Sequence, residues 1–218
     1  MRTIATTVIL GLMVTTAASA QERKGYLKAD AGFATSTDAT SRAMNAELGK
    51  SVTRFVLVFG EFGRLSNLQP SAVQPTVDAA VSNLQSVGYS VLGAAKNPAW
   101  YSAGGVRIAA PSGIIRPYVT TAVGFARLTS TAKFTYQSGT TISGADATAG
   151  EDATSDVVSN GYFTTPSATN DFLIRFGGGV QIPLAKAVAA DVSYNASRIW
   201  AATPVTTNGL NFGVVVRF

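Results

Sequence analysis

Apolar side chains recur at every second position along most of the chain after residue 25, and this period of two constrains the fold more than any other feature. The segment from Leu210 to Phe218 shows it most clearly, because Leu210, Phe212, Val214, Val216 and Phe218 are all apolar. Successive side chains of a strand point to opposite faces. Such runs therefore predict strands that each have one apolar face.

Eight runs show this alternation, at residues 26–34, 44–49, 54–65, 100–109, 115–125, 172–182, 188–195 and 210–218. Run 54–65 is the least regular, since Phe55, Leu57 and Phe59 share a face with Glu61 and Gly63. It requires either a β-bulge or an unusual inner face. The length of the runs matches the ~9–11 residues with which a tilted strand crosses a membrane.

The connections between the runs alternate in length. Short ones at 50–53, 111–114 and 185–187 alternate with longer ones at 36–42, 66–98, 129–170 and 201–208. Short turns at one end and long loops at the other are typical of outer-membrane barrels, whose short turns face the periplasm. The sequence therefore predicts an all-β fold, an eight-stranded antiparallel up-and-down transmembrane β-barrel. A soluble eight-stranded barrel of the lipocalin kind is the competing interpretation.

Charged residues in the middle of the runs favour the membrane barrel. They lie on the less apolar face, which a membrane barrel turns toward a polar lumen and a soluble barrel buries in an apolar core. We expect a hydrogen-bonded lumen network of four cations and four anions. Its members are Lys28, Asp30, Glu47, Glu61, Arg107, Arg116, Arg175 and Asp191.

Aromatic residues near the ends of the runs predict two girdles at the membrane interfaces. The periplasmic girdle comprises Tyr26, Phe55, Tyr118 and Phe218. The outer girdle comprises Phe33, Phe62, Trp100, Tyr101, Phe125, Phe172 and Trp200.

The composition excludes several classes of function. The chain has no histidine and no cysteine, which removes Ser-His-Asp triads, HExxH metal sites, thiolate zinc sites and cysteine nucleophiles. A net charge of +5 is too small to indicate nucleic-acid binding. We therefore expect a protein that is not an enzyme and has no cofactor, no metal and no nucleic-acid partner.

Residues 1–20 have the features of a cleaved secretory signal peptide. Arg2 supplies a positive charge, an apolar segment runs from Ile4 to Val14, and Ala18-Ser19-Ala20 is a small-residue cleavage site. The apolar segment is shorter than the ~20 residues of a membrane-spanning helix, which argues against a retained anchor. We expect the mature barrel domain to comprise residues 21–218.

The ending Asn208-Gly-Leu-Asn-Phe-Gly-Val-Val-Val-Arg-Phe218 resembles the C-terminal assembly signal of bacterial outer-membrane proteins. Segments 115–128 and 176–184 also look like strands of small barrels. Over residues 25–218, the chain resembles the small bacterial outer-membrane β-barrel domain family, similar to the OmpA N-terminal domain and OmpX. The resemblance implies signal-peptide-dependent export, contact with outer-membrane lipid, and insertion by the barrel-assembly machinery with help from periplasmic chaperones. The assembly signal would comprise Leu210, Phe212, Val214, Val216 and Phe218.

Two functions remain open for such a barrel. The first is a structural or envelope-integrity role, or surface interaction through the extracellular loops, above a lumen filled by the charged network. The alternative is a narrow passive channel for small solutes or ions. An eight-stranded barrel is only wide enough for side chains to fill its interior, which favours the first.

Two of the long connections contain smaller signals. From Ser71 to Val87, apolar residues at helical spacing predict a short helix, which we expect to pack over the barrel rim. In the segment 129–170, Asp146, Glu151, Asp152 and Asp156 do not have the spacing of an EF-hand, so we expect a solvated loop there.

Overall fold

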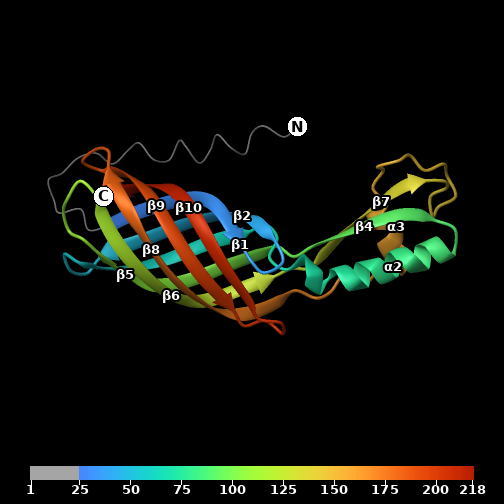
Figure 1. Cartoon of the computed structure of the whole chain (residues 1–218), viewed down its shortest axis with the longest axis horizontal. Helices are drawn as coiled ribbons and strands as arrows, with labels where there is room; N and C mark the ends of the chain where they lie inside the picture. Colours follow the sequence, from blue (N-terminus) through green and yellow to red (C-terminus); the bar gives the residue numbers. More distant parts are fainter. Residues whose placement is uncertain (1–24) are drawn as a thin grey trace.

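Eight strands close into a barrel (Figure 1). The structure is a computed structural model that describes residues 25–218, so the expected signal peptide at 1–20 lies outside the described residues. In chain order the barrel strands are β1 (Gly25–Thr35), β2 (Thr40–Ser51), β3 (Val56–Leu65), β5 (Ala99–Ala109), β6 (Arg116–Leu128), β8 (Thr169–Pro183), β9 (Val188–Ile199) and β10 (Val205–Arg217). Around the barrel the order is β1-β10-β9-β8-β6-β5-β3-β2, and every neighbouring pair is antiparallel. The predicted eight-stranded antiparallel barrel is confirmed.

Side chains alternate between the inside and the outside of the barrel, as the sequence pattern predicts. On β1, Lys28 and Asp30 are buried inside, whereas Phe33 is exposed on the outer surface. Strand β3 contains no bulge, because its pairing with β2 and β5 runs without a register shift. Phe59 and Glu61 both point inward and are buried. The irregular run 54–65 is therefore explained by an unusual inner face that includes a phenylalanine.

The two ends of the barrel carry different connections. At one end, called the turn end below, the segments 52–55, 110–115 and 184–187 join the strands, and the C-terminus lies there too (Figure 1). At the opposite end, 36–39 and 200–204 are equally short. The expected long loops at 36–42 and 201–208 are wrong, because the strands extend beyond the clear alternation. Only the segments 66–98 and 129–168 are long.

These two long segments fold together instead of forming loops. Contrary to expectation, they contain two more strands, β4 (Ser90–Lys96) and β7 (Thr131–Ser138), which pair in a separate two-stranded sheet. Ala99 of β5 faces Leu128 of β6, and three residues further out Lys96 faces Thr131, so both ladders share one register. The β4–β7 ribbon is therefore the outward continuation of β5 and β6 (Figure 1). Residues 66–98 and 129–168 are called the arm below.

Three helices cover this ribbon: η1 (Pro70–Ala72), α2 (Gln74–Ser86) and α3 (Thr154–Ser159). The helix predicted within Ser71–Val87 is confirmed, but its expected place over the barrel rim is wrong. Val77 and Leu84 of α2 are fully buried in one cluster with Phe134 and Tyr136 of β7. The arm thus has a hydrophobic core of its own, separate from that of the barrel.

No helix among residues 25–218 is long and apolar enough to span a membrane.

Candidate functional site in the barrel lumen

Seven of the eight charged residues predicted for the lumen are buried inside the barrel. They are Lys28, Asp30, Glu47, Glu61, Arg107, Arg175 and Asp191, each less than a tenth exposed. The eighth, Arg116, is only partly buried at the turn end and forms no ion pair with a described residue. The buried set, called the lumen cluster below, contains three cations and four anions.

The first group of the lumen cluster joins β2 to β5 across the intervening β3. Nη2 of Arg107 lies 2.7 Å from Oε1 and 2.8 Å from Oε2 of Glu47. Tyr26 donates a hydrogen bond from its hydroxyl to the same carboxylate. The Arg107 guanidinium also lies 4.3 Å from the centroid of the Tyr118 ring, a cation–π contact. Glu47 is therefore held by charge-assisted bonds on two sides.

The second group is centred on Lys28 of β1. Its Nζ lies 2.7 Å from Oδ1 of Asp191 on β9 and 3.1 Å from Oδ2 of Asp30. The Tyr118 hydroxyl, from β6, lies 2.9 Å from both carboxylate oxygens of Asp191 and donates to that carboxylate. Strands β1, β6 and β9 are thus tied together through the middle of the barrel.

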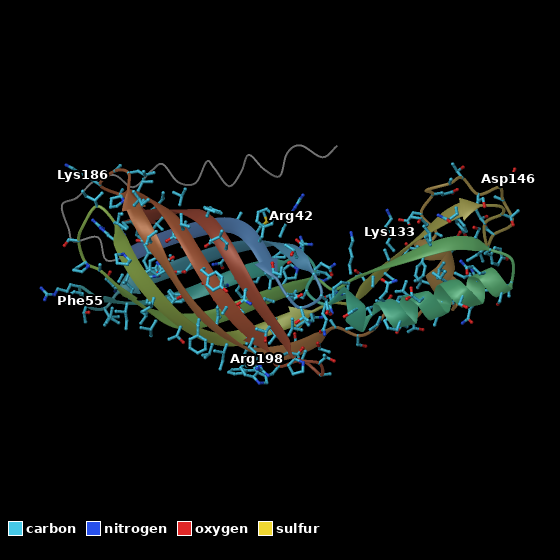
Figure 2. The ribbon with its side chains drawn as sticks, viewed as in Figure 1. Arg42, Phe55, Lys133, Asp146, Lys186 and Arg198 are labelled. Carbon is cyan, nitrogen blue, oxygen red and sulfur yellow. The ribbon has the colours of Figure 1, made fainter. Side chains whose placement is uncertain are left out.

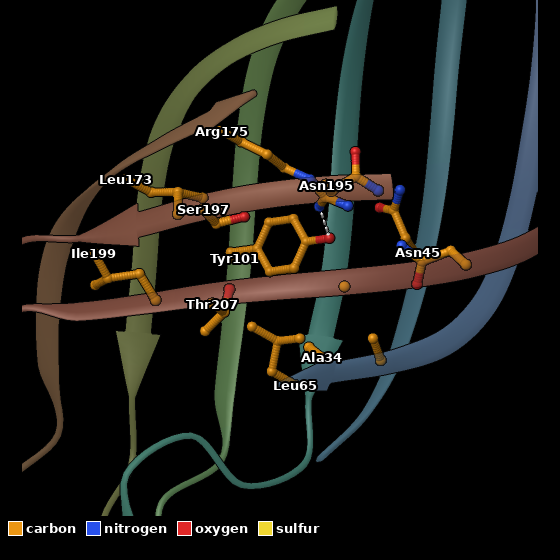
Figure 3. A pocket seen from close by; sticks show the side chains of 13 residues that line it. Ala34, Asn45, Leu65, Tyr101, Leu173, Arg175, Asn195, Ser197, Ile199 and Thr207 are labelled. Atoms are coloured by element: carbon orange, nitrogen blue, oxygen red, sulfur yellow. Dashed lines mark hydrogen bonds between the residues drawn. The ribbon is translucent and has the colours of Figure 1, made fainter. Parts of the chain in front are cut away.

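The third group is looser and lies nearer the arm. Nη1 of Arg175 is 3.5 Å from Oε2 of Glu61 and donates a hydrogen bond to the Tyr101 hydroxyl (Figure 3). Asn45 Nδ2 lies 3.4 Å from both Asp30 Oδ2 and Glu61 Oε2, and so connects this group to the second. Asp30 and Glu61 each retain one carboxylate oxygen without a hydrogen-bond partner among the described residues.

Three tyrosines belong to this lumen and were missed by the reasoning from sequence. The prediction that Tyr26, Tyr101 and Tyr118 lie in interfacial girdles is wrong, because all three point inward and are buried. The signal that could have placed them is the alternation itself, since Tyr26 shares a face with Lys28 and Tyr118 shares one with Arg116.

Each lumen tyrosine lies directly opposite a glycine of the neighbouring strand. The pairs are Tyr26 with Gly49, Tyr101 with Gly63, and Tyr118 with Gly179. A Cβ on any of these glycines would overlap the facing tyrosine. Glycine therefore creates the room in which a large ring lies flat against the barrel wall.

The lumen is filled rather than open. Two cavities within it have volumes of about 20 and 10 Å³, roughly the space needed by one water molecule each. The larger one is lined at the arm end by Asn45, Tyr101 and Arg175 (Figure 3). The arrangement consists of ion pairs and hydrogen bonds that connect opposite walls.

No metal-binding group of three acidic side chains occurs in the part of the chain that the structure describes. Two acidic residues of the arm make local hydrogen bonds instead. Asp156, in α3, accepts a hydrogen bond of 2.8 Å from the Tyr136 hydroxyl, and Asp152 Oδ1 accepts one of 2.9 Å from the Thr154 amide. The expectation of a solvated loop is wrong for Asp156, which is part of a helix packed on the ribbon.

At the turn end the lumen widens into a cavity of about 180 Å³, called the vestibule below. Four arginines line it, and no described acidic residue does. The arginines are Arg54, Arg107, Arg116 and Arg217, and the remaining lining consists of apolar residues together with Tyr26, Ser51 and Gln181. This is where the structure places Arg116.

The outer surface of the barrel is apolar between its two ends. At the arm end, aromatic rings form a row over neighbouring strands, with ring centroids 5.3 Å apart for Phe62 and Trp100 and 6.1 Å for Phe125 and Phe172. Every charged side chain on an outward-facing position of the described barrel strands is a cation. These are Arg42, Arg64, Arg127 and Arg198 at the arm end, of which Figure 2 labels two, and Lys50 at the turn end.

No family model and no curated protein matches the sequence. Among solved structures, the chain resembles Neisserial surface protein A with a TM-score of 0.56 and 14% identity, over 89% of this chain and 97% of that chain. A major outer membrane protein from Thermus thermophilus gives a TM-score of 0.51 and 8% identity, over 89% of this chain and 99% of that chain. At these identities the likeness establishes the fold, which is that of small outer-membrane barrels, in agreement with the resemblance noted from the sequence.

Proposed function

We propose that this protein is an integral, non-enzymatic barrel of the bacterial outer membrane that holds a folded arm outside the cell for surface interaction. The observation that carries the proposal is the shared register of β4–β7 with β5–β6. The arm is not a flexible loop, because it continues two membrane strands and has its own core.

The outer surface supports residence in a membrane. Large apolar side chains such as Phe33, Phe125, Phe176 and Phe212 are more than half exposed on the barrel wall. A contiguous apolar surface of this size is unfavourable in water and matches lipid. The competing soluble barrel would instead turn its charged residues outward, and those seven are buried in the lumen cluster.

Both long segments lie at one end of the barrel, which supports an orientation with the arm outside, and outward-facing arginines at that end match a membrane interface. Arg64 and Arg198 lie beside interfacial rings, with their guanidinium carbons 5.0 Å and 5.7 Å from the centroids of Trp100 and Trp200. Long cationic side chains at this level reach the polar headgroup region while their stems stay in lipid. The short connections of the turn end then face the periplasm, as in other barrels of this architecture.

The closing strand supports assembly in that membrane. Leu210, Phe212, Val214, Val216 and Phe218 form the outward-facing apolar row of β10 and the chain end, and β10 pairs with β1. This row is the proposed signal for the barrel-assembly machinery, after export by a signal peptide at residues 1–20 and escort by periplasmic chaperones.

The alternative function, a narrow passive channel, is disfavoured by the filled lumen. Ion pairs of 2.7 Å cross it at Glu47–Arg107 and Lys28–Asp191, and the cavities inside hold about one water each. We expect rare, small conductance events from the refolded protein in a planar bilayer. A large, steady conductance would favour the channel.

The role of the arm is tested with a matched pair of substitutions in the ribbon. Phe134 is fully buried in the arm core, whereas Leu92 is about half exposed on the same ribbon. Phe134→Asp should unfold the arm, since loss of a buried Phe alone costs ~3–5 kcal/mol, while Leu92→Asp should leave it folded. Both variants should keep heat-modifiable gel mobility in the outer-membrane fraction, because neither touches the barrel.

Two readouts on intact cells then separate location from function. Protease added outside the cells should cleave the arm of Phe134→Asp and spare the wild type and Leu92→Asp. Cells displaying the wild type should attach to a host-cell monolayer or aggregate with one another, and those with Phe134→Asp should lose this. Equal attachment by all three would refute the surface role, and resistance of Phe134→Asp to external protease would refute the orientation.

A further inference from the structure

The vestibule at the turn end is lined by four arginines from four segments of the chain. Arg54 lies in the turn before β3, Arg107 on β5, Arg116 on β6 and Arg217 on β10. None of the described residues that line it is acidic. Residues so far apart in sequence converge there only because the barrel closes.

Three of these positive charges have no acidic partner among the described residues. Arg107 is paired with Glu47, but Arg217 donates a hydrogen bond from Nη2 to the neutral amide of Gln181, and Arg116 lies opposite Gln181 in the ladder. The Nε atoms of Arg107 and Arg116 are buried and have no hydrogen-bond partner among residues 25–218. Like charges held together in a partly enclosed site repel one another. An anion would relieve this repulsion and accept hydrogen bonds from the two unpaired Nε–H groups.

The residue type and the size of the space indicate the class of anion. All four cations are arginines, whose planar fork of donors matches the paired oxygens of a phosphate better than a lysine ammonium does. The volume of about 180 Å³ is an order of magnitude larger than the ~10–15 Å³ that one water needs. A phosphate group therefore fits with part of its hydration.

We propose that the vestibule is a binding site for a phosphate group that enters from the turn end of the barrel. The group is supplied either by free phosphate or by the headgroup of a phospholipid at the neighbouring leaflet. Arg116 and Arg217 bind it directly, Arg54 closes the site from the exposed turn, and Arg107 connects it to the lumen cluster through Glu47. The site is independent of the arm and of its surface role.

The test is a calorimetric titration of inorganic phosphate into the refolded mature barrel in micelles of a detergent that has no phosphate group, such as an amine oxide. The double variant Arg116→Gln/Arg217→Gln should bind about a hundredfold more weakly, since each lost charge-assisted contact weakens binding by about tenfold. The control Arg42→Gln/Arg198→Gln removes the same charge at the opposite end of the barrel and should bind phosphate like the wild type. Equal weakening of phosphate binding in both double variants would show that binding depends only on net charge, and would overturn the proposed site.

A second variant keeps the proposal testable if the double variant fails to fold. Ala109 lines the vestibule on the inward face of β5, so Ala109→Glu would place a carboxylate among the arginines without removing any of them. This variant should melt at a higher temperature than the wild type and should not respond to phosphate. Unchanged phosphate binding by Ala109→Glu would contradict the proposal.

Lipid vesicles distinguish the two sources of the phosphate group. The barrel is reconstituted in vesicles of an uncharged glycolipid, whose headgroup has no phosphate, with or without phosphatidylglycerol, and phosphate is titrated again. If phosphatidylglycerol abolishes phosphate binding in the wild type and leaves the melting temperature of Arg116→Gln/Arg217→Gln unchanged, the site takes a lipid headgroup. If binding persists in both vesicles, the site takes free phosphate. The absence of phosphate binding in micelles and in both vesicles would overturn the proposal.

Discussion

The hydroxyl oxygen of Tyr118 lies 2.7 Å from the point where a Cβ on Gly179 would stand, and the two residues face each other directly across β6 and β8. The same hydroxyl donates to Asp191, which pairs with Lys28. Because Gly179 has no side chain, the Tyr118 ring can lie against β8, where its hydroxyl holds the central ion pair of the lumen.

Replacement of Gly179 by alanine should destabilise the barrel. The new methyl group would lie 2.5 Å from the carbonyl oxygen of Val192 as well as against Tyr118, and the backbone cannot move away without breaking the β8–β9 ladder. Overpacking of this kind costs ~1–3 kcal/mol, and the displaced tyrosine would add to it. The measurement is the free energy of unfolding in urea or guanidinium, with the barrel in detergent micelles.

Gly60 provides the matched control for that substitution. It lies on the outward face of β3, and a Cβ there would have no atom within 4 Å. Gly60→Ala should be neutral or slightly stabilising, since alanine lowers the entropy of the unfolded chain. If Gly179→Ala were as stable as Gly60→Ala, the close approach of Tyr118 would not be needed for the packing of the lumen.

The ion pairs of the lumen should differ in their contribution to stability. Glu47 makes contacts of 2.7 and 2.8 Å with Arg107, whereas Glu61 lies 3.5 Å from Arg175. Glu47→Ala leaves a buried guanidinium unpaired and should cost ~3–5 kcal/mol, and Glu61→Ala should cost less. Arg116→Ala, at the open vestibule, serves as the control with the smallest loss in the same unfolding assay.

The same looser pair should control the rare conductance of the barrel. Glu61→Ala or Arg175→Ala removes a side chain that lines a small lumen cavity, so we expect larger conductance events together with lower thermal stability. Single-channel recording in planar bilayers checks the first effect and thermal unfolding the second. Unchanged stability in both variants would show that the pair is not formed in the lumen.

The terminal phenylalanine should matter more for assembly than for stability. The backbone N–H of Phe218 donates to the Gly25 carbonyl at 3.0 Å, and the Gly25 N–H donates back at 2.9 Å, while the ring of Phe218 is half exposed on the outer surface. Loss of the ring removes ~1.5–3 kcal/mol of burial against lipid. Deletion of Phe218, or Phe218→Ala, should reduce insertion in cells more strongly than refolding in detergent.

Phe212 is the appropriate comparison, because it is a lipid-facing phenylalanine of the same strand with similar exposure. Phe212→Ala should lower stability in detergent by a similar amount but leave insertion in cells largely intact. Equal levels of Phe218→Ala and wild type in the outer membrane would contradict the proposed assembly signal.

The arm should respond to alkaline pH through Tyr136. Burial and the hydrogen bond to Asp156 raise the pKa of the Tyr136 hydroxyl above its ordinary value, which is ~10 in an unfolded chain. Because folding favours the neutral phenol, this contribution to stability is complete below pH ~10 and is lost as the pH rises toward the raised pKa. The tyrosinate absorbance should therefore lose one step above the ordinary range of tyrosine in Tyr136→Phe, and loss of a step within the ordinary range would contradict this.

The alternation of side chains was sufficient to predict the barrel from the sequence. Eight runs of period two determine which residues face inward, and the structure places Lys28, Glu47 and Asp191 on the predicted face. The physical reason is that a strand has only two faces, so one clear contrast between apolar and polar positions fixes the orientation of every side chain along it. The same rule places Tyr118 in the lumen, because it lies two positions from Arg116 and so shares its face. Its position near the end of the strand pointed to a girdle instead.

The tertiary structure alone decided what lies at the two ends of the barrel. The ribbon of β4 and β7 is stabilised by packing against α2, for instance by Phe134 against Val77, since a two-stranded ribbon is not stable alone. Its alternation of apolar and polar residues is too short and too weak to predict two strands from the sequence. The meeting of Arg116 with Arg217 in the vestibule, rather than with an anion in the lumen, depends on strand register and barrel closure. Local sequence determines the face on which a side chain lies, but only the pairing of distant strands determines its height in the barrel and its neighbours across the lumen.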